Sequence, residues 1–302
     1  MRFKYPVYIP TTRSYINITE LTNNHYGTLV KYIANNDAPG LESAFNELIS
    51  ELTGVSHGKF NKIDKFCILL TARIMCVGPE LPLEFKCSKT EQKYKGDVDL
   101  NHVLQLISDL SIHKPKNIHI KKNIQIKIGT PVSFYIPNDD ILDAFTDAIY
   151  EITISNQQFD LTSTTIEEKN KVFDRLAGVN FSTILKSTTV FQRSFKDIVV
   201  FSDKNPHDED AEIIDYKLGL YDNTMFDFIR LTFTSNIQSY YNTIYALCDS
   251  MGFTADYANS ITPVEASIYI QNKAQEIEKQ NQAQKQKQPQ SVGGMPAPPM
   301  AF

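Results

Sequence analysis

The stretch from Asn61 to Gly78 constrains the fold of this chain more than any other part of the sequence. Apolar side chains lie on most sides of a helix drawn through it, and only Asp64, Lys65 and Arg73 interrupt them. A helix that is apolar nearly all round has to be covered by other elements. The asparagine is a suitable N-cap and the glycine a suitable end. We therefore predict a helix at the centre of a helical domain.

The rest of residues 1–114 supplies short elements that can cover such a helix. Apolar and polar residues alternate over 5–9 and 15–19, on either side of a Pro-Thr-Thr-Arg turn, which predicts an N-terminal β-hairpin. Helical spacing of apolar residues predicts three helices, over 23–35, 41–53 and 99–110, and strand alternation predicts a hairpin over 81–98. Residues 1–114 are thus expected to form a mainly helical domain that carries β-hairpins.

The middle region, residues 115–221, has the strongest β signal in the chain. Isoleucines alternate with polar residues over 118–128, and a further apolar run covers 132–136. This pattern is typical of strands with one buried face. Helices are predicted over 139–150 and 166–176, so we expect this region to mix the two kinds of element.

Residues 222–282 return to helical periodicity. Apolar positions three and four apart run from Phe226 to Leu247, and a helix start follows at Thr262, where a hydroxyl cap precedes a proline and an acid. The last helix runs into a Gln- and Lys-rich tract. The Gly- and Pro-rich end, residues 283–302, has few side chains that can pack, and we expect it to be a disordered tail. The predicted fold class is α+β.

Charge and cysteine content narrow the functional classes. Lys and Arg number 30 and Asp and Glu 35, which gives a net charge of -5. A chain of this acidity repels phosphate at long range, so a nucleic-acid binder driven by bulk charge is disfavoured. The 4 cysteines form no CxxC pair, which indicates reduced thiols rather than a disulfide framework. No signal peptide and no run of about 18 apolar residues is found, so no membrane segment is expected.

Few side chains suggest chemistry, because the chain has no Walker, dinucleotide-binding, nucleophile-elbow or zincin motif. Two groups of potential metal ligands leave a metal-dependent enzyme as an alternative function. The first is His207, Asp208, Glu209 and Asp210, and the second is Cys87, His102, His113 and His119. The spacing of both departs from that of calcium loops and zinc sites. Lys121, Lys122 and Lys127 suggest a nucleic-acid face, but without aromatic platforms the solvent face of a sheet is favoured. We expect no catalytic residue, metal or cofactor.

The arginine of the apolar helix predicts an ion pair. A buried guanidinium needs a carboxylate partner, and Asp64 or Glu80 can serve Arg73. We interpret Asp64 and Arg73 as a structural pair rather than as an anion-binding site.

Three isoleucines in the last helix are candidates for partner binding. If Ile268, Ile270 and Ile277 remain exposed, they suit docking into a groove or coiled-coil pairing. The alternative is that they pack on the chain's own core, and the sequence favours neither.

Several of these strings together resemble a known family. The opening YPVYIPTTRSYINITELT, the central NKIDKFCILLTARIMCVGPELPLEFKC and the later GFTADYANSITPVEASIYIQNKAQEIEKQ are similar to segments of the baseplate hub and tail assembly proteins of T-even-type (T4-like) phages. The match places Asp64, Arg73, Gly78 and Cys87 on family-like positions and covers about 1–110 and 222–280.

The resemblance implies a non-enzymatic role in building the baseplate of a contractile tail, through protein–protein contacts. The chain would be either a resident hub component or a transient assembly chaperone that is absent from the mature virion. Its expected partners are other tail and baseplate proteins, with the tape measure protein as one candidate, and self-association is a further option. Neither nucleic acid nor a membrane is an expected partner. The expected location is the host cytoplasm during assembly and, for a resident component, the tail baseplate.

Overall fold

The chain combines helices with several small antiparallel sheets, which is the α+β class that the sequence predicts. The computed structural model describes residues 3–86, 93–110, 114–121, 123–137, 140–162, 164–175, 198–204, 213–234 and 237–287. Its α-helices are α1 (Asn23–Ala34), α2 (Ala38–Thr53), α3 (Lys62–Val77), α4 (Leu100–Ser108), α5 (Ile141–Asp147), α6 (Ile166–Arg175), α8 (Thr224–Thr232), α9 (Ile237–Met251), α10 (Ala255–Ser260) and α11 (Pro263–Lys287). Its strands are β1 (Lys4–Ile9), β2 (Ser14–Thr19), β3 (Glu80–Lys86), β4 (Lys93–Asp99), β5 (Lys116–Lys121), β6 (Ile124–Ile128), β7 (Ile149–Ile154), β8 (Gln157–Asp160), β9 (Val199–Lys204) and β10 (Ile213–Lys217).

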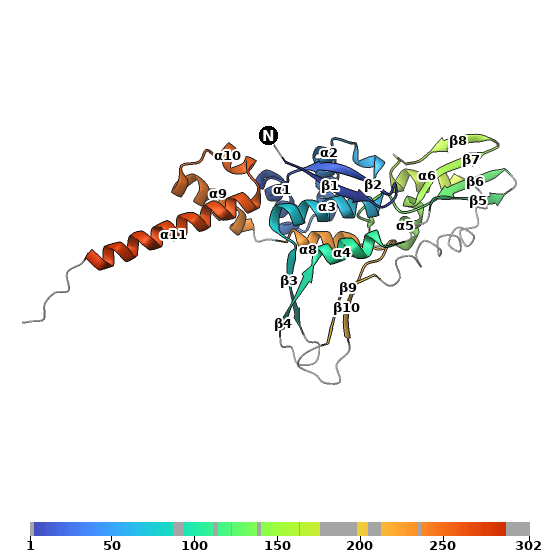
Figure 1. Cartoon of the computed structure of the whole chain (residues 1–302). Helices are drawn as coiled ribbons and strands as arrows, with labels where there is room; N and C mark the ends of the chain where they lie inside the picture. Colours follow the sequence, from blue (N-terminus) through green and yellow to red (C-terminus); the bar gives the residue numbers. More distant parts are fainter. Residues whose placement is uncertain are drawn as a thin grey trace, which may run out of the picture.

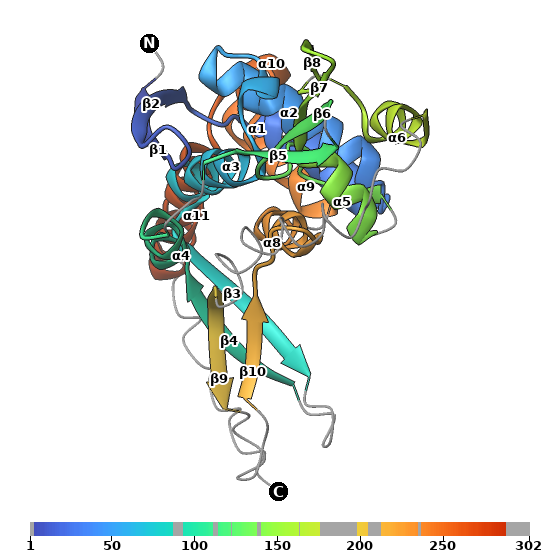
Figure 2. The same cartoon turned by 90° about the vertical axis from the view of Figure 1, so that its right-hand side faces the viewer.

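Helix α3 is the central element, as its apolar sequence predicts. Every residue from Lys62 to Ile74 is buried. The Asn61 side chain caps the start of the helix by accepting a hydrogen bond from the Asp64 N–H at 3.0 Å. Gly78 ends it with a φ of 117°, a conformation that favours glycine. Strands and helices of the N-terminal half, together with helix α8, pack around α3 (Figure 2).

The small sheets confirm both predicted hairpins, β1-β2 and β3-β4, and add a third, β9-β10, that the sequence did not predict. Strand β1 pairs with β2, β3 with β4 and β9 with β10, each as an antiparallel pair, and β5-β6-β7-β8 form a four-stranded antiparallel sheet. Hairpins β3-β4 and β9-β10 extend side by side from the helices in both views (Figures 1 and 2). One prediction was too long: the helix expected over 139–150 ends as α5 at Asp147, and Ile149 and Tyr150 begin strand β7.

The strand predicted over 132–136 is wrong, because residues 130–136 cross the core without regular structure. Within this core segment Phe134 and Ile136 are fully buried. Its backbone N–H groups donate to side chains instead of to a neighbouring strand, in five hydrogen bonds of 2.6–3.0 Å: Val132 and Ser133 to Asp147, Phe134 and Tyr135 to Glu42, and Ile136 to Asn223. Buried backbone groups need partners, and acidic and amide side chains supply them here.

Buried lysines accompany these carboxylates. The Lys65 ammonium lies 3.9 Å from Glu42, and that of Lys169 lies 3.9 Å from Asp147, whose carbonyl oxygen it also contacts at 2.8 Å. Burial lowers the pKa of both lysines, and the neighbouring carboxylates act in the opposite direction. The core segment is therefore held by a network of buried, paired charges that joins α2, α3, α5 and α6.

One large hydrophobic core unites the first three quarters of the chain. Its buried residues run from Val7 to Phe233, so the regions expected over 1–114 and 115–221 share it. Helix α8, expected with the C-terminal helices, also belongs to it, because Phe226, Phe228 and Ile229 are buried there. We call residues 3–234 the body.

Residues 237–287 form a separate C-terminal unit of three helices. Their own small core consists of Leu247, Ala258, Ile261 and Ala266. Figure 1 shows α11 extending beyond α9 and α10, away from the rest of the molecule. This helix continues to Lys287, past the predicted start of the tail at residue 283, and residues 288–302 lie outside the described residues.

The C-terminal unit is attached to α1 by close contacts. The backbone N–H and the side-chain amide of Asn23 donate to the carbonyl oxygens of Ile261 and Ala258, both at 2.8 Å. The Tyr240 ring packs directly on Gly27, where a Cβ atom would lie 2.3 Å from the ring. A larger residue at this point of α1 would require the Tyr240 ring to move.

Candidate protein-protein interface

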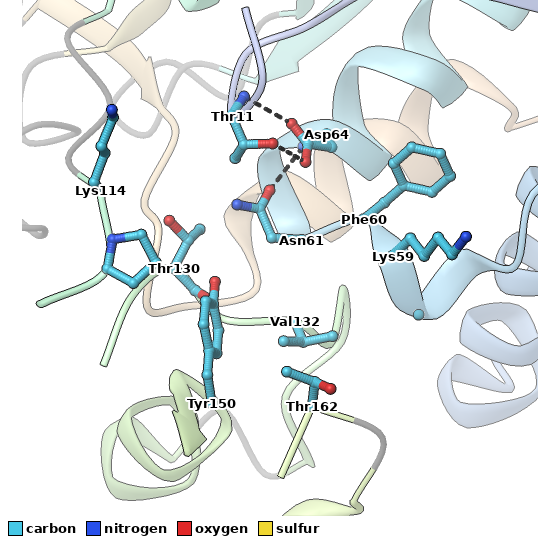
Figure 3. Close-up of a pocket in the computed structure, with 12 residues that line it drawn as sticks. Thr11, Lys59, Phe60, Asn61, Asp64, Lys114, Thr130, Val132, Tyr150 and Thr162 are labelled. Atoms are coloured by element: carbon cyan, nitrogen blue, oxygen red, sulfur yellow. Dashed lines mark hydrogen bonds between the residues drawn. The ribbon is translucent and has the colours of Figure 1, made fainter. Parts of the chain in front are cut away.

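A polar pocket lies between the N-terminal hairpin, the start of α3 and the four-stranded sheet (Figure 3). Its volume is about 200 Å³. The backbone N–H and the hydroxyl of Thr11 donate to the Asp64 carboxylate at 3.1 and 2.5 Å. Burial raises the pKa of Asp64, and these hydrogen bonds partly oppose that effect. On the opposite wall the Tyr150 hydroxyl donates to the Thr130 carbonyl at 2.6 Å.

The lining of this pocket does not assemble a catalytic set. It contains one carboxylate, hydroxyl groups and two lysines, but neither His nor Cys. The one carboxylate, Asp64, accepts two hydrogen bonds from Thr11 of the hairpin turn. The carboxylate thus anchors the turn between β1 and β2 on α3.

The structure does not bring Asp64 and Arg73 together, which corrects the predicted ion pair. Arg73 is buried, and its guanidinium donates to the carbonyl oxygens of Thr232 at 2.7 Å and Gly78 at 2.8 Å. The two residues are nine positions apart, and an α-helix rises about 1.5 Å per residue, so they lie near opposite ends of α3. Arg73 instead binds carbonyl groups at the C-terminal ends of α8 and α3, where the helix dipoles favour a cation.

The three candidate isoleucines of α11 differ in their surroundings. Ile268 is 50% exposed and Ile277 is 47% exposed, whereas Ile270 packs against the small core of the C-terminal unit. Both alternatives left open by the sequence therefore occur within one helix. Two of the side chains are accessible to a partner, and the third stabilises the unit.

Exposed apolar side chains gather in the C-terminal unit. Of the large apolar and aromatic residues that are exposed in the described part of the chain, more than half belong to it: Tyr241, Tyr245, Tyr257, Val264, Ile268, Tyr269 and Ile277. Single exposed apolar residues are ordinary, but a concentration of them marks interaction surfaces. Tyrosine in particular is enriched where proteins bind one another. Only the isoleucines were singled out from the sequence, because the exposure of the tyrosines depends on how the three helices pack.

The other candidate sites are only partly visible. Cys87, His113, Lys122 and residues 207–210 lie outside the described residues. Within the described ranges, no three His, Cys, Asp or Glu side chains form a group that could hold a metal ion. The Lys127 ammonium lies 4.0 Å from the Glu151 carboxylate on the neighbouring strand. The helices that the structure describes include none with the length and apolar character needed to cross a membrane.

A chain whose exposed apolar residues gather on a projecting helical unit has the surface of a protein that binds other proteins. The comparison with protein families identifies the kind of protein. Residues 2–196, more than half of the chain, match the family described as T4 bacteriophage base plate protein, and the chain belongs to this family. Neither a curated protein nor a solved structure matches it. Membership confirms the resemblance to phage baseplate proteins, and it implies contacts with other tail and baseplate proteins and a place in the virion tail.

Proposed function

We propose that this protein is a resident, non-catalytic component of the baseplate hub, and that its C-terminal unit docks on neighbouring tail proteins. The observation that carries the proposal is the exposure of Ile268 and Ile277 on a helix that extends away from the body. The family match ends at residue 196, within the body, so the C-terminal unit lies beyond the matched part. We infer that the body is the common scaffold and that the unit selects the partner.

The lack of a catalytic arrangement in the polar pocket supports the non-catalytic part of the proposal. The hydrogen bond from Thr11 to Asp64 holds the hairpin turn in place, and the hydrogen bond from Tyr150 holds the backbone at Thr130. A protein that acts by binding neighbouring proteins through its shape and apolar surface needs no catalytic residues.

Mass spectrometry of purified phage particles tests residence in the virion. A hub component is expected in intact particles at a fixed ratio to other baseplate proteins. A protein that is present in assembly intermediates but missing from particles would instead be a transient chaperone, the second role compatible with the family. Chemical cross-linking of the same particles tests the hub location, and cross-links only to peripheral baseplate proteins would contradict it.

Substitution of the exposed isoleucines tests the docking surface. The double variant Ile268→Ser, Ile277→Ser should fold normally, because both side chains are exposed, yet be recovered in baseplates at about a tenth of the normal level. The matched control is Phe159→Ser, which removes an exposed apolar side chain from β8 in the body. Equal incorporation of the double variant and the control would show that the isoleucines bind no partner.

A further inference from the structure

Three aromatic rings form a contiguous patch on the C-terminal unit. The Phe253 ring stands nearly perpendicular to Tyr257, with centroids 5.0 Å apart, and to Tyr269, with centroids 5.2 Å apart. Tyr257 is 46% exposed and Tyr269 is 39% exposed, while Phe253 packs against the small core. The patch is thus built on the unit's own interior and presents the two tyrosines to solvent. We call these three residues the aromatic patch.

A carboxylate lies beside the aromatic patch. Glu265 lies close enough to act on Tyr257, whose pKa is raised first by its hydrogen bond with Tyr269 and also by this carboxylate. Glu265 is itself held in place, because it accepts a hydrogen bond from the Thr262 N–H at 2.8 Å at the start of α11. An aromatic face beside a fixed carboxylate attracts cations, through the ring quadrupole and through direct charge attraction.

The charge balance of the part of the unit that carries the patch, residues 237–278, has the same sign. Residues 237–278 contain five acidic side chains and a single basic one: Asp249, Asp256, Glu265, Glu276 and Glu278, against Lys273. All five acidic residues are exposed. The rest of α11, residues 279–287, adds Lys279, Lys285 and Lys287, so the net charge of the whole unit is -1 and its negative charge lies at the end that carries the patch. Complementary charge steers partners together and rejects those of like charge.

We propose that the aromatic patch binds a Lys- or Arg-bearing segment of another tail protein, with the cationic group against Tyr257 and Tyr269 and beside Glu265. This inference rests on the proposed function, and it adds the chemistry of the partner. Apolar residues flanking the cation in that segment would contact the exposed side chains of the same unit, such as Ile268. Arginine with tyrosine is a frequent combination at the centres of protein interfaces.

A second copy of this chain is a poorer occupant of the same surface. A symmetric dimer through the patch would bring two patches together, each with its Glu265 carboxylate, and like charges across an interface are unfavourable. The partner is therefore inferred to be a different protein, of basic character where it makes contact.

Site-specific photo-cross-linking in the full-length chain tests the proposal. A benzophenone amino acid replaces Tyr257, or replaces Tyr15 on β2 as an exposed position in the body, and assembling baseplates are irradiated. The expected product at position 257 is a peptide of another tail protein that contains Lys or Arg next to apolar residues. A peptide of acidic character, a peptide of a second copy, or no product at 257 while position 15 yields a tail protein would overturn the proposal and leave the proposed function intact. Absence of tail-protein products at both positions would count against both.

Binding of the captured segment then measures the contribution of each ring. The probe is a synthetic peptide of the cross-linked sequence, together with a copy in which citrulline replaces Arg and norleucine replaces Lys. Tyr257→Ala and Tyr269→Ala should each weaken binding of the charged probe about tenfold, and the neutral copy should bind as weakly to the unaltered chain. The matched control, Tyr245→Ala on α9, removes an exposed tyrosine outside the patch and should change binding by less than about twofold. Equal affinities for the two probes would overturn the cationic assignment.

Discussion

In the body, several charged side chains are buried and paired, whereas in the C-terminal unit several apolar and aromatic side chains are exposed. Asp147 and Lys169 are almost completely buried around the core segment, while Ile268 and Tyr257 face solvent on α11 and α10. Buried charges are costly unless they are paired and hydrogen-bonded, so they persist where they hold one particular arrangement of chain. Exposed aromatic residues gain little for the isolated protein and become useful when a partner covers them.

The difference separates the part that holds the fold together from the part that we propose binds partners. The family match covers much of the body and none of the C-terminal unit. We infer that the internal network preserves the scaffold and that the small unit, with its separate core, adapts the scaffold to its neighbours. Three substitutions test this division, in order of decreasing effect.

The largest effect is expected from Asp147→Ala. This substitution removes the acceptor for the backbone N–H groups of Val132 and Ser133 and leaves the Lys169 ammonium without its carboxylate. Loss of one member of a buried ion pair destabilises by about 3–5 kcal/mol. The free energy of unfolding, measured in urea, should fall by this amount or the chain should fail to fold. Glu151→Gln, which alters the more exposed pair with Lys127, is the control and should cost less than about 1 kcal/mol.

An intermediate effect, confined to the C-terminal unit, is expected from Gly27→Ala. The added Cβ atom would lie 2.3 Å from the Tyr240 ring, whose hydroxyl donates to Asn259 at 2.8 Å. Displacing the ring should weaken the attachment of the unit by about 1–3 kcal/mol. Hydrogen exchange should quicken in α9–α11 and remain unchanged in α3. Gly58→Ala is the control, because its nearest new contact is an ordinary 3.9 Å; equal exchange in both variants would show that the unit does not depend on this contact.

The smallest effect is a change in the pH dependence of stability in Asp64→Asn. Burial raises the pKa of this carboxyl, so the folded state holds the proton more tightly than the unfolded state. The stability contributed by that proton is present at acid pH and is lost as the pH rises through the folded-state pKa. The Tm of the variant minus that of the unaltered chain should therefore increase from about pH 4 to about pH 7. A difference that stays constant or decreases would show that Asp64 is not destabilised by burial.

Local sequence was sufficient for elements whose signals lie within a few residues. The cap at Asn61, the stop at Gly78 and the alternating residues of β5 and β6 predicted the central helix and part of the four-stranded sheet, and the structure confirms them. The helix start at Thr262 was also correct, since its hydroxyl accepts a hydrogen bond from the Glu265 N–H at 3.2 Å.

Prediction failed where the partners of a segment are distant in the sequence. Residues 132–136 have the alternation of a strand, but their N–H groups bind Glu42, Asp147 and Asn223, which no local pattern could identify. The helical periodicity of residues 222–251 also did not show that they belong to two cores, because α8 packs in the main core and α9 in the small one.

The amino-acid sequence by itself determined the apolar helix at the centre, the hairpins β1-β2 and β3-β4, the α+β class and the resemblance to phage baseplate proteins, because periodicity and capping act between neighbouring residues. Only the tertiary structure decided that Arg73 binds helix carbonyls instead of Asp64, and that Tyr257 and Tyr269 both pack against Phe253 at the surface. Such contacts depend on how whole helices pack, and a buried charge accepts whichever partner the packing brings within reach.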